Sequence, residues 1–401
     1  MPITSHTSCG RWRDRFQQLD KLLMDTQPLW RPQPFKEVRP QWCQQYPQLT
    51  SDLLQINDKD LARLQSSTHD LQQLLGSYLP ELQALPALTE LSVLPRTEMQ
   101  WPANHFFAAI PGRKRAQIEA FTATIGKVHE PIVEWCGGKG HLGRLLAMQW
   151  RTAVTTLEWN SQLCKDGARR ADKAGVAQQF EVMDVLAPQR PLDLHGKHAV
   201  ALHACGVLHR TLGQHVTQVN APALDIAPCC YAVGVEDKYQ SFTALGKLKL
   251  SRDDLRLAVT ETVTAGSREV RLRDTEMAWK LGFNLLRAEL FEESAYHSMK
   301  PISKGWLKMD FAGFCRQLAL REGIRLPDTV HWADYEASGW QRQREVMRLL
   351  LVRSGFRRAL ELWLVLDMVC WLELNDYRVE LGTFCERQLT PRNILISARR
   401  E

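Results

Sequence analysis

The sequence predicts an α/β fold built on a doubly wound, mostly parallel β-sheet. Short apolar runs typical of buried strands alternate with helical patterns between residues 131 and 227, as in successive βα units of a parallel sheet. A glycine-rich turn follows the first of these runs, at residues 136–140. Near the C-terminus, an apolar helical segment precedes two more strand-like runs, which predicts that the sheet is closed by an antiparallel hairpin.

The first strand and its turn are the centre of the predicted site. Residues 131–147 read PIVEWCGGKGHLGRLLA: a short strand ending at Glu134, a turn, and the start of a helix. Gly138 and Gly140 lack a Cβ atom, so the backbone of the turn can bend sharply and approach a ligand closely. A strand, a glycine turn and a helix N-terminus together predict a site for a nucleotide-type cofactor.

Acidic residues at the ends of three successive strands favour S-adenosylmethionine (SAM) over a dinucleotide. The glycines alone fit a dinucleotide pattern that is weak in isolation. A carboxylate at Glu134 would attract the ammonium of a methionine moiety and repel a pyrophosphate. Glu158 ends the second run and suits the ribose hydroxyls, and Asp184 ends the third, near the adenine amino group. We expect SAM as the cofactor, with NAD or a purely structural turn as the alternatives.

Seven strands are expected in all. The first five lie near residues 131–135, 153–158, 179–184, 198–203 and 223–227. The last two run from Tyr377 to Phe384 and from Asn393 to Ser397, after a long buried helix from Phe356 to Leu374. An antiparallel end of the sheet argues against an NAD-type fold, whose sheet would end in parallel strands.

The remaining segments are predicted to be mainly helical. We expect a helical N-terminal region over residues 1–100, a cofactor-binding core over 101–231, a helical insertion over 232–355, and a helix with a hairpin over 356–401. The last segment completes the core.

The composition is that of an ordinary globular protein with a mildly basic character. The 401 residues are 44% hydrophobic and 24% charged, and the net charge of +6 permits an acidic partner such as RNA without requiring one. The ten cysteines contain no C-x-x-C pair, so neither a disulfide framework nor a metal site is predicted, and a reducing cytoplasm is expected. No signal-peptide core stands at the N-terminus, and residues 359–372 are too short an apolar run to span a membrane.

Four motifs give the chain a resemblance to a known family. They are GGKGHLGRLLA, LHACG (Leu202 to Gly206), PCCY (Pro228 to Tyr231) and LTPRNILISARR (Leu389 to Arg400). As a set they resemble a group of SAM-dependent methyltransferase-domain proteins, which includes the proteins once labelled rRNA adenine dimethylase domain-containing and has bacterial members. More distantly, the GKG, H-x-C-G and CC elements resemble the tRNA 2′-O-methyltransferases that act on the acceptor stem. The resemblance covers residues 111–401, and Cys136 departs from it, because the common SAM pattern has glycine there.

The loops after the fourth and fifth strands are expected to hold the methyl acceptor. They carry His203 and Cys205, and Cys229, Cys230 and Tyr231, respectively. Tyr231 would stack on an acceptor base, and His203 would act as a general base near neutral pH. A cysteine, Cys229 among them, would either be a nucleophile or pack as a small buried hydrophobic residue. We favour acceptor contact for Tyr231 and packing for the cysteine pair.

The resemblance implies the class I SAM methyltransferase fold, with SAM along the carboxyl edge of the sheet. Glu134, Cys136, Gly138 and Gly140 would hold the methionine half, Glu158 the ribose and Asp184 the adenine. The expected reaction is methyl transfer to RNA, with tRNA ahead of rRNA. The alternatives are a protein methyltransferase and a non-catalytic SAM-fold protein that binds RNA.

Two basic clusters are candidate phosphate contacts. Arg113 to Arg115 precede a helix, and six arginines lie between Arg342 and Arg358. The plainer interpretation of the second cluster is a solvated helix face.

Overall fold

The chain forms two compact units that are interleaved in sequence. The computed structural model describes residues 8–108, 110–187, 192–260, 266–293 and 296–401. The sheet unit comprises Met1–Met24, Ala87–Glu261 and Arg357–Glu401, and the helical unit comprises Asp25–Pro86 and Thr262–Phe356. The predicted N-terminal region and the predicted insertion are therefore each divided between the two units.

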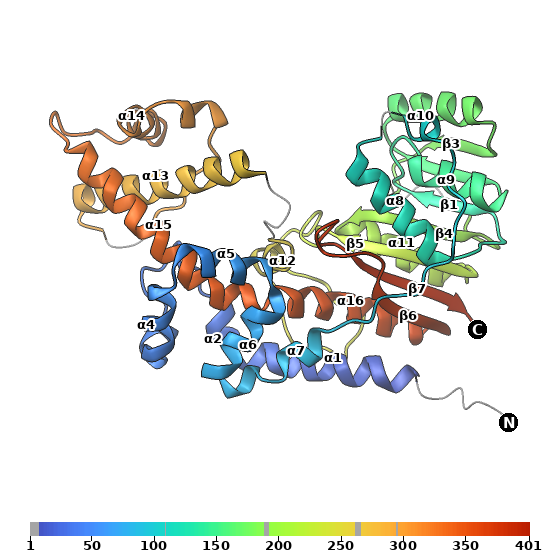
Figure 1. Ribbon diagram of the computed structural model, residues 1–401, viewed down its shortest axis with the longest axis horizontal. Coiled ribbons are helices and arrows are strands. Elements are labelled where there is room, and N and C mark those ends of the chain that lie inside the picture. The colour runs from blue at the N-terminus through green and yellow to red at the C-terminus, as the bar shows by residue number, and fades with distance from the viewer. Residues whose placement is uncertain (1–7, 109, 188–191, 261–265, 294–295) are drawn as a thin grey trace. The chain divides into compact units, whose positions relative to one another are not determined.

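A seven-stranded sheet forms the centre of the sheet unit (Figure 1). The strands are β1 (Ile132–Trp135), β2 (Val154–Glu158), β3 (Gln178–Val182), β4 (His198–Cys205), β5 (Ala223–Cys229), β6 (Tyr377–Thr383) and β7 (Ile394–Arg400). Their order is β3-β2-β1-β4-β5-β7-β6. Strands β1 to β5 are parallel, and β7 is antiparallel to both β5 and β6. The predicted α/β fold, the class I SAM methyltransferase sheet and its terminal hairpin are confirmed.

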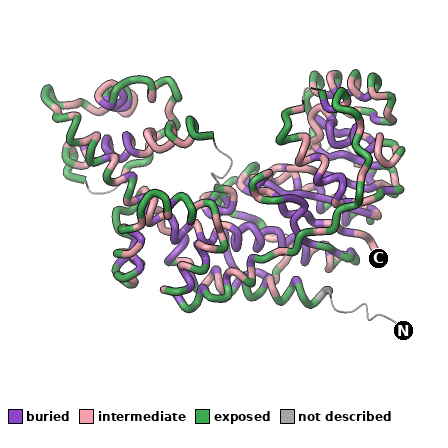
Figure 2. The backbone as a smooth tube through the Cα atoms, in the orientation of Figure 1, coloured by how far each residue is buried: buried purple, intermediate pink, exposed green. Residues whose placement is uncertain are grey.

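The helices of the sheet unit pack on the strands or on one another through buried side chains. They are α1 (Ser8–Asp25), α8 (Gly112–Ile125), α9 (His141–Trp150), α10 (Ser161–Ala174), α11 (Val207–Gln218), α12 (Arg252–Val259) and α16 (Arg357–Glu373), with the short η2 (Asn104–Phe107). Leu142 and Leu145 of α9 share one core with Phe121 of α8 and Ile132 of β1. Helix α16 packs against β6 and is buried along nearly its whole length (Figure 2). A helix that is mainly apolar and buried on all sides is typical of a protein core.

Two buried carboxylates fasten the segment before α12 to the rest of the sheet unit. Asp367 of α16 accepts hydrogen bonds from the backbone N–H of Phe242 (2.7 Å) and Thr243 (3.0 Å), and from the hydroxyls of Thr243 (2.9 Å) and Tyr239 (3.0 Å). Asp20 of α1 accepts from the backbone N–H of Leu248 at 3.0 Å in a similar way. The N–H and O–H groups of an irregular stretch of chain thus find hydrogen-bond acceptors in two buried carboxyl groups on helices.

The helical unit is built around two long helices, α13 (Ser267–Phe291) and α15 (Trp332–Gly355). The other members are α2 (Gln27–Trp30), α3 (Trp42–Gln45), α4 (Pro47–Gln55), α5 (Asp58–Ser66), α6 (Thr68–Tyr78), η1 (Pro80–Leu82), η3 (Lys304–Lys308) and α14 (Phe311–Glu322), and α7 (Leu85–Thr89) crosses the boundary in sequence. Gly282 lets α13 and α15 approach closely, because a Cβ atom there would lie 2.6 Å from the carbonyl oxygen of Tyr335. No helix in the described ranges is long and apolar enough to cross a membrane.

The arginines of α15 bind backbone carbonyls of their own unit. Arg342 Nη2 donates to the carbonyl of Pro34 at 2.6 Å, and Arg348 Nε donates to that of Ile56 at 2.7 Å. Arg353 Nη1 donates to the carbonyl of Arg31 at 2.5 Å. These three guanidinium groups satisfy chain segments that have no helix or sheet partner, so they are less available as the phosphate track that is one interpretation of the cluster. Arg344 of the same cluster is exposed.

Replacing Asp367 with alanine is expected to lower the free energy of unfolding by roughly 3 kcal/mol or more, because each buried donor left without a partner costs about 1–3 kcal/mol. Urea denaturation followed by circular dichroism measures the change. Asp172→Ala, on the exposed side of α10, is the matched control and should leave the midpoint unchanged. Equal midpoints for the two variants would show that Asp367 does not hold the segment.

Candidate functional site

The turn between β1 and α9 combines tight packing with one open position. Cys136, Gly138 and Gly140 have positive φ angles of 53°, 61° and 62°. A Cβ atom on Gly137 would lie 2.5 Å from the carboxyl carbon of Glu134, so only glycine fits there. A Cβ atom on Gly138 would meet nothing within 4 Å among the described residues. Gly138 is therefore where a ligand can approach the backbone.

The Glu134 carboxyl group lies beneath this turn. Its Oε2 accepts the hydroxyl of Thr156 on β2 at 2.7 Å, and the backbone N–H of Gly143 on α9 also donates to it. Burial raises the pKa of Glu134 to about 7. The prediction that Glu134 contacts the methionine ammonium directly does not fit this geometry, because the turn covers the carboxyl group. The side chain instead ties β1, β2 and α9 together.

Glu158, at the end of β2, is buried and hydrogen-bonds to the backbone of the turn. Its Oε2 accepts the backbone N–H of Gly138 at 3.0 Å, and its Oε1 accepts that of Asn160 at 3.0 Å. Asp184 follows β3 and is exposed, with its Oδ1 accepting the N–H of Leu186 at 3.0 Å. The structure thus brings Glu158, which is predicted to bind the ribose, to the glycine turn. It places Asp184, which is predicted to lie near the adenine, after the adjacent strand.

Trp159 is a candidate that the sequence prediction missed. It follows Glu158 directly, and 76% of its surface is exposed, an unusual position for the largest apolar side chain. An exposed indole beside a ribose acid offers a flat face on which an adenine can stack. The feature of the sequence that could have pointed to Trp159 is its position immediately after Glu158, the acid that ends β2.

The Cys136 thiol is influenced by groups at the ends of three other strands. The pKa of this thiol is raised to about 12, first by burial and then by the charges of Glu158, Cys205 and Asp184. These groups come from the ends of β2, β4 and β3. Cys136 stays protonated at neutral pH and is not a nucleophile.

His203 stands in a distortion at the end of β4. Its φ is 66°, and the pairing of β4 with β5 shifts register between Leu202 and Cys205. Its Nε2 lies 3.2 Å from Oε1 of Gln117 on α8, so with the amide oxygen as acceptor this nitrogen carries the proton. Its Nδ1 is buried and has no hydrogen-bond partner among the described residues.

The environment of His203 keeps the ring neutral. Burial lowers its pKa to about 4; Cys230 opposes this shift, and the positive charges of Lys114, Arg392 and Arg113 act with burial. The expectation of a base that titrates near neutral pH is therefore wrong. A neutral imidazole with an unused Nδ1 lone pair remains able to accept a hydrogen bond or a proton.

Three thiols meet where β4 and β5 end. Cys205 and Cys229 are partners in the strand register, and their Sγ atoms lie 3.2 Å apart. The Sγ of Cys230 lies within 4.8 Å of both, and its backbone has a φ of 47°. Hydrogen bonding with the other two thiols lowers the pKa of Cys230 and raises that of Cys229.

Tyr231 does not face an acceptor. Its side chain is fully buried, and its ring packs edge-on against that of His209 with centroids 5.5 Å apart. Its hydroxyl has no partner in the described part of the chain, and burial raises its pKa well above the usual value. The prediction that Tyr231 stacks on an acceptor base is corrected, because the ring has no open face.

Arg392 of the TPRN motif holds the hairpin to two helices. Its Nη1 donates to the carbonyl of Ala258 at the end of α12 at 3.4 Å, and lies 3.5 Å from Oε1 of Glu361 on α16. Arg358 pairs with the other oxygen of Glu361 at 2.7 Å. The motif is thus part of a buried ion network next to the acceptor loops.

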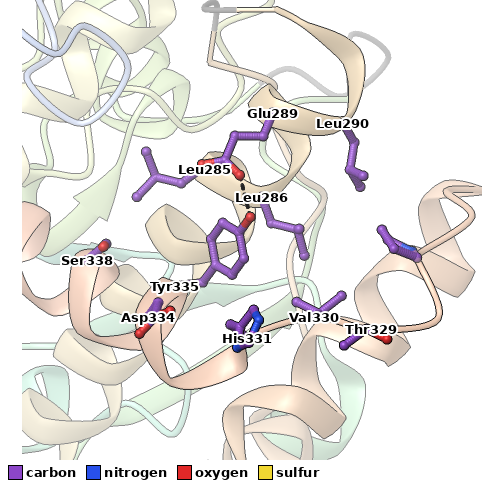
Figure 3. Close-up of a pocket in the computed structure, with 11 residues that line it drawn as sticks. Leu285, Leu286, Glu289, Leu290, Thr329, Val330, His331, Asp334, Tyr335 and Ser338 are labelled. Carbon is purple, nitrogen blue, oxygen red and sulfur yellow. Dashed lines mark hydrogen bonds between the residues drawn. The ribbon is translucent and has the colours of Figure 1, made fainter.

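The helical unit has a cavity of its own, of about 510 Å³, between α13 and α15 (Figure 3). Leu286 and Val330 contribute apolar walls, and the hydroxyl of Tyr335 donates to Glu289 within it. None of the predicted site residues lines this cavity, so the candidate site is that of the sheet unit.

Comparison with known proteins supports a methyltransferase domain in this unit. Residues 113–234 match the family model described as "Methyltransferase domain". The glutathione S-transferase C-terminal domain-containing protein of Mus musculus is 30% identical over 123 residues, which is 30% of this chain and 19% of that protein. The Homo sapiens protein of the same name is 29% identical over 123 residues, again 19% of its length. The chain therefore spans only a small part of the curated relatives that it matches.

Similar solved structures include methyltransferases. The tRNA (uracil-54, C5)-methyltransferase of Pyrococcus abyssi, in complex with S-adenosyl-L-homocysteine, has a TM-score of 0.23 at 17% identity, over 29% of this chain and 28% of that one. The 23S rRNA methyltransferase ErmE has a TM-score of 0.24 at 14% identity, over 58% and 97%. The matched family model spans the glycine turn, β1 to β5 and the three thiols. The match to the methyltransferase domain model thus lies within the sheet unit, whose strand order is that of the class I SAM methyltransferase fold.

Proposed function

We propose that the protein is a SAM-dependent methyltransferase whose cofactor lies along the carboxyl ends of β1, β2 and β3. The observation that carries this proposal is the hydrogen bond between Glu158 and the Gly138 N–H. It joins an acid suited to ribose hydroxyls with a backbone position that is open to a ligand. Asp184 then supplies a hydrogen-bond acceptor for the adenine amino group, and Trp159 supplies a face on which the adenine can stack.

SAM, when bound, supplies an activated methyl group for displacement by an acceptor atom. The chain's own contribution is mainly to hold the two reactants in line. Glu134 positions the turn and does not touch the ligand. The neutral ring of His203 lies at the acceptor side, where its Nδ1 could receive the acceptor's proton.

The acceptor that we propose is RNA, with tRNA ahead of rRNA. The positive charges that act on His203 come from Arg113, Lys114 and Arg392, so the acceptor edge is basic. Lys114 is exposed and has no ion-pair partner in the described ranges, whereas Arg115 pairs with Glu119 at 2.8 Å. A basic entrance suits phosphates. The preference for tRNA rests on the resemblance of the motifs.

Cofactor binding is expected to depend on Glu158 and Trp159. Glu158→Ala should weaken SAM binding roughly 10–100-fold, because a hydrogen bond to a charged group contributes about 1.5–3 kcal/mol. Trp159→Ala should weaken it about tenfold, since stacking on an aromatic side chain contributes about 1–3 kcal/mol per base. Isothermal titration calorimetry with SAM measures both. Trp101→Ala, at another exposed tryptophan, is the control. Unchanged affinity in both site variants would refute the proposed cofactor site.

The buried Glu134 should make stability depend on pH in a defined direction. An unfolded glutamate ionises near about pH 4.3, whereas the folded pKa is about 7. Between these two pH values the folded chain keeps the Glu134 proton and the unfolded chain has lost it. The stability that this proton contributes to the folded state is therefore lost as the pH rises through the folded pKa. The unfolding free energy of Glu134→Gln, minus that of the wild type, should therefore increase across this interval. Urea titrations at several pH values test this, and a constant difference would contradict a buried, protonated Glu134.

RNA binding is expected to depend on the first turn of α8. The double variant Arg113→Glu, Lys114→Glu should bind bulk tRNA more weakly, and the slope of log K against log salt should fall by about 1–2, as for the loss of two phosphate contacts. The double variant Arg268→Glu, Arg344→Glu, at two exposed arginines of α13 and α15, is the charge-matched control. Filter binding over a salt series measures the slope. If wild-type protein binds SAM but retains no tRNA at low salt, the acceptor is not RNA, and a protein acceptor becomes the better hypothesis.

A further inference from the structure

The three thiols of Cys205, Cys229 and Cys230 form a group that the proposed methyl transfer does not use. All three Sγ atoms lie within 4.8 Å of one another. The residues come from two strand ends that are far apart in sequence and adjacent in the sheet. Packing alone needs no such convergence, because buried cysteines elsewhere in the unit, such as Cys164 and Cys385, belong to no comparable group of thiols in the described residues.

The backbone around this group is held in conformations that cost free energy. Cys230 has a φ of 47°, and His203, two residues before Cys205, has a φ of 66°. Positive φ is uncommon for residues other than glycine and is energetically unfavourable at each position. The register shift in β4 falls between Leu202 and Cys205, where such irregularities re-aim side chains. Both distortions thus lie at the residues that bring the sulfur atoms together.

We propose that Cys205, Cys229 and Cys230 bind one thiophilic divalent cation, Zn²⁺, at the acceptor edge of the sheet. Zinc–thiolate bonds of about 2.3 Å in a tetrahedral site place the sulfur atoms about 3.8 Å apart. The observed 3.2 Å between Cys205 and Cys229, and the 4.8 Å limit for all three, bracket that spacing. Three protein ligands leave a fourth position for water or an acceptor atom, as in catalytic zinc sites.

The charge balance of the site is consistent with this proposal. Binding would convert three thiols to thiolates and release three protons, so the Zn²⁺ centre would carry a net charge of −1. The guanidinium of Arg392 exerts its positive charge on Cys230, and Arg113 and Lys114 act on the neighbouring His203. These cations would offset the negative centre. The inference stands on the thiols themselves and does not depend on which molecule is methylated.

The test uses the full-length protein, purified with a reductant, stripped of metal with a chelator and titrated with Co²⁺ and Zn²⁺. We expect one equivalent of Co²⁺ per chain with thiolate-to-cobalt charge-transfer absorption and the visible bands of a tetrahedral ion. One equivalent of Zn²⁺ should displace it. Cys205→Ser, Cys229→Ser and Cys230→Ser should each weaken binding more than about 100-fold, since losing even an outer-shell partner costs roughly 10–100-fold. Cys385→Ser, a buried cysteine of the same unit, should bind as the wild type does.

Two results would overturn the proposal. The first is wild-type protein that shows no charge-transfer absorption when Co²⁺ is added. This result does not depend on whether the cysteine variants fold. The second is a Cys205–Cys229 disulfide, found by mass spectrometry in protein purified without a reductant. In this case the same protein would bind no metal even after the disulfide is reduced. SAM affinity, measured on the same metal-free and metal-loaded samples, separates failure of the metal site from failure of the proposed methyltransferase function.

Discussion

The candidate site depends on one buried carboxyl group. Glu134 accepts hydrogen bonds from the Thr156 hydroxyl and the Gly143 N–H, so it fixes β1, β2 and the start of α9 to one another. The turn closes over it only because Gly137 has no side chain. With the turn held there, the Gly138 N–H faces Glu158 at 3.0 Å. A carboxyl group beneath the turn thus sets the geometry of the proposed cofactor site.

Several arginines bind groups inside their own unit. Arg342, Arg348 and Arg353 of α15 donate to backbone carbonyls, and Arg392 bridges the end of α12 and Glu361. A net charge of +6 therefore overstates how basic the accessible surface is. The exposed Lys114 and its neighbours matter more for an acidic acceptor than the longer arginine run, because they lie beside His203.

Backbone strain collects at the same edge of the sheet. Cys136, His203 and Cys230 are non-glycine residues with positive φ, and they follow or end β1, β4 and β5. Strained residues of this kind persist only where the surrounding structure holds them, and they cluster at functional sites. Here they border both halves of the site, the cofactor turn on one side and the neutral imidazole with the three thiols on the other.

The sequence by itself determined the elements of the sheet, and it predicted the cofactor half of the site. Local apolar periodicity placed all seven strands and helix α16 to within a few residues. The roles of Gly138, Glu158 and Asp184 stay predictions, made because the carboxyl ends of parallel strands share one edge. Trp159 was missed although it stands immediately after the acid that ends β2, because the exposure of its side chain depends on the tertiary structure. Only the tertiary structure decided that Tyr231 turns inward, that the α15 arginines bind carbonyls, and that Cys205 meets Cys229 across 24 residues of chain. Side-chain direction and long-range pairing depend on packing and strand register, which local patterns do not encode.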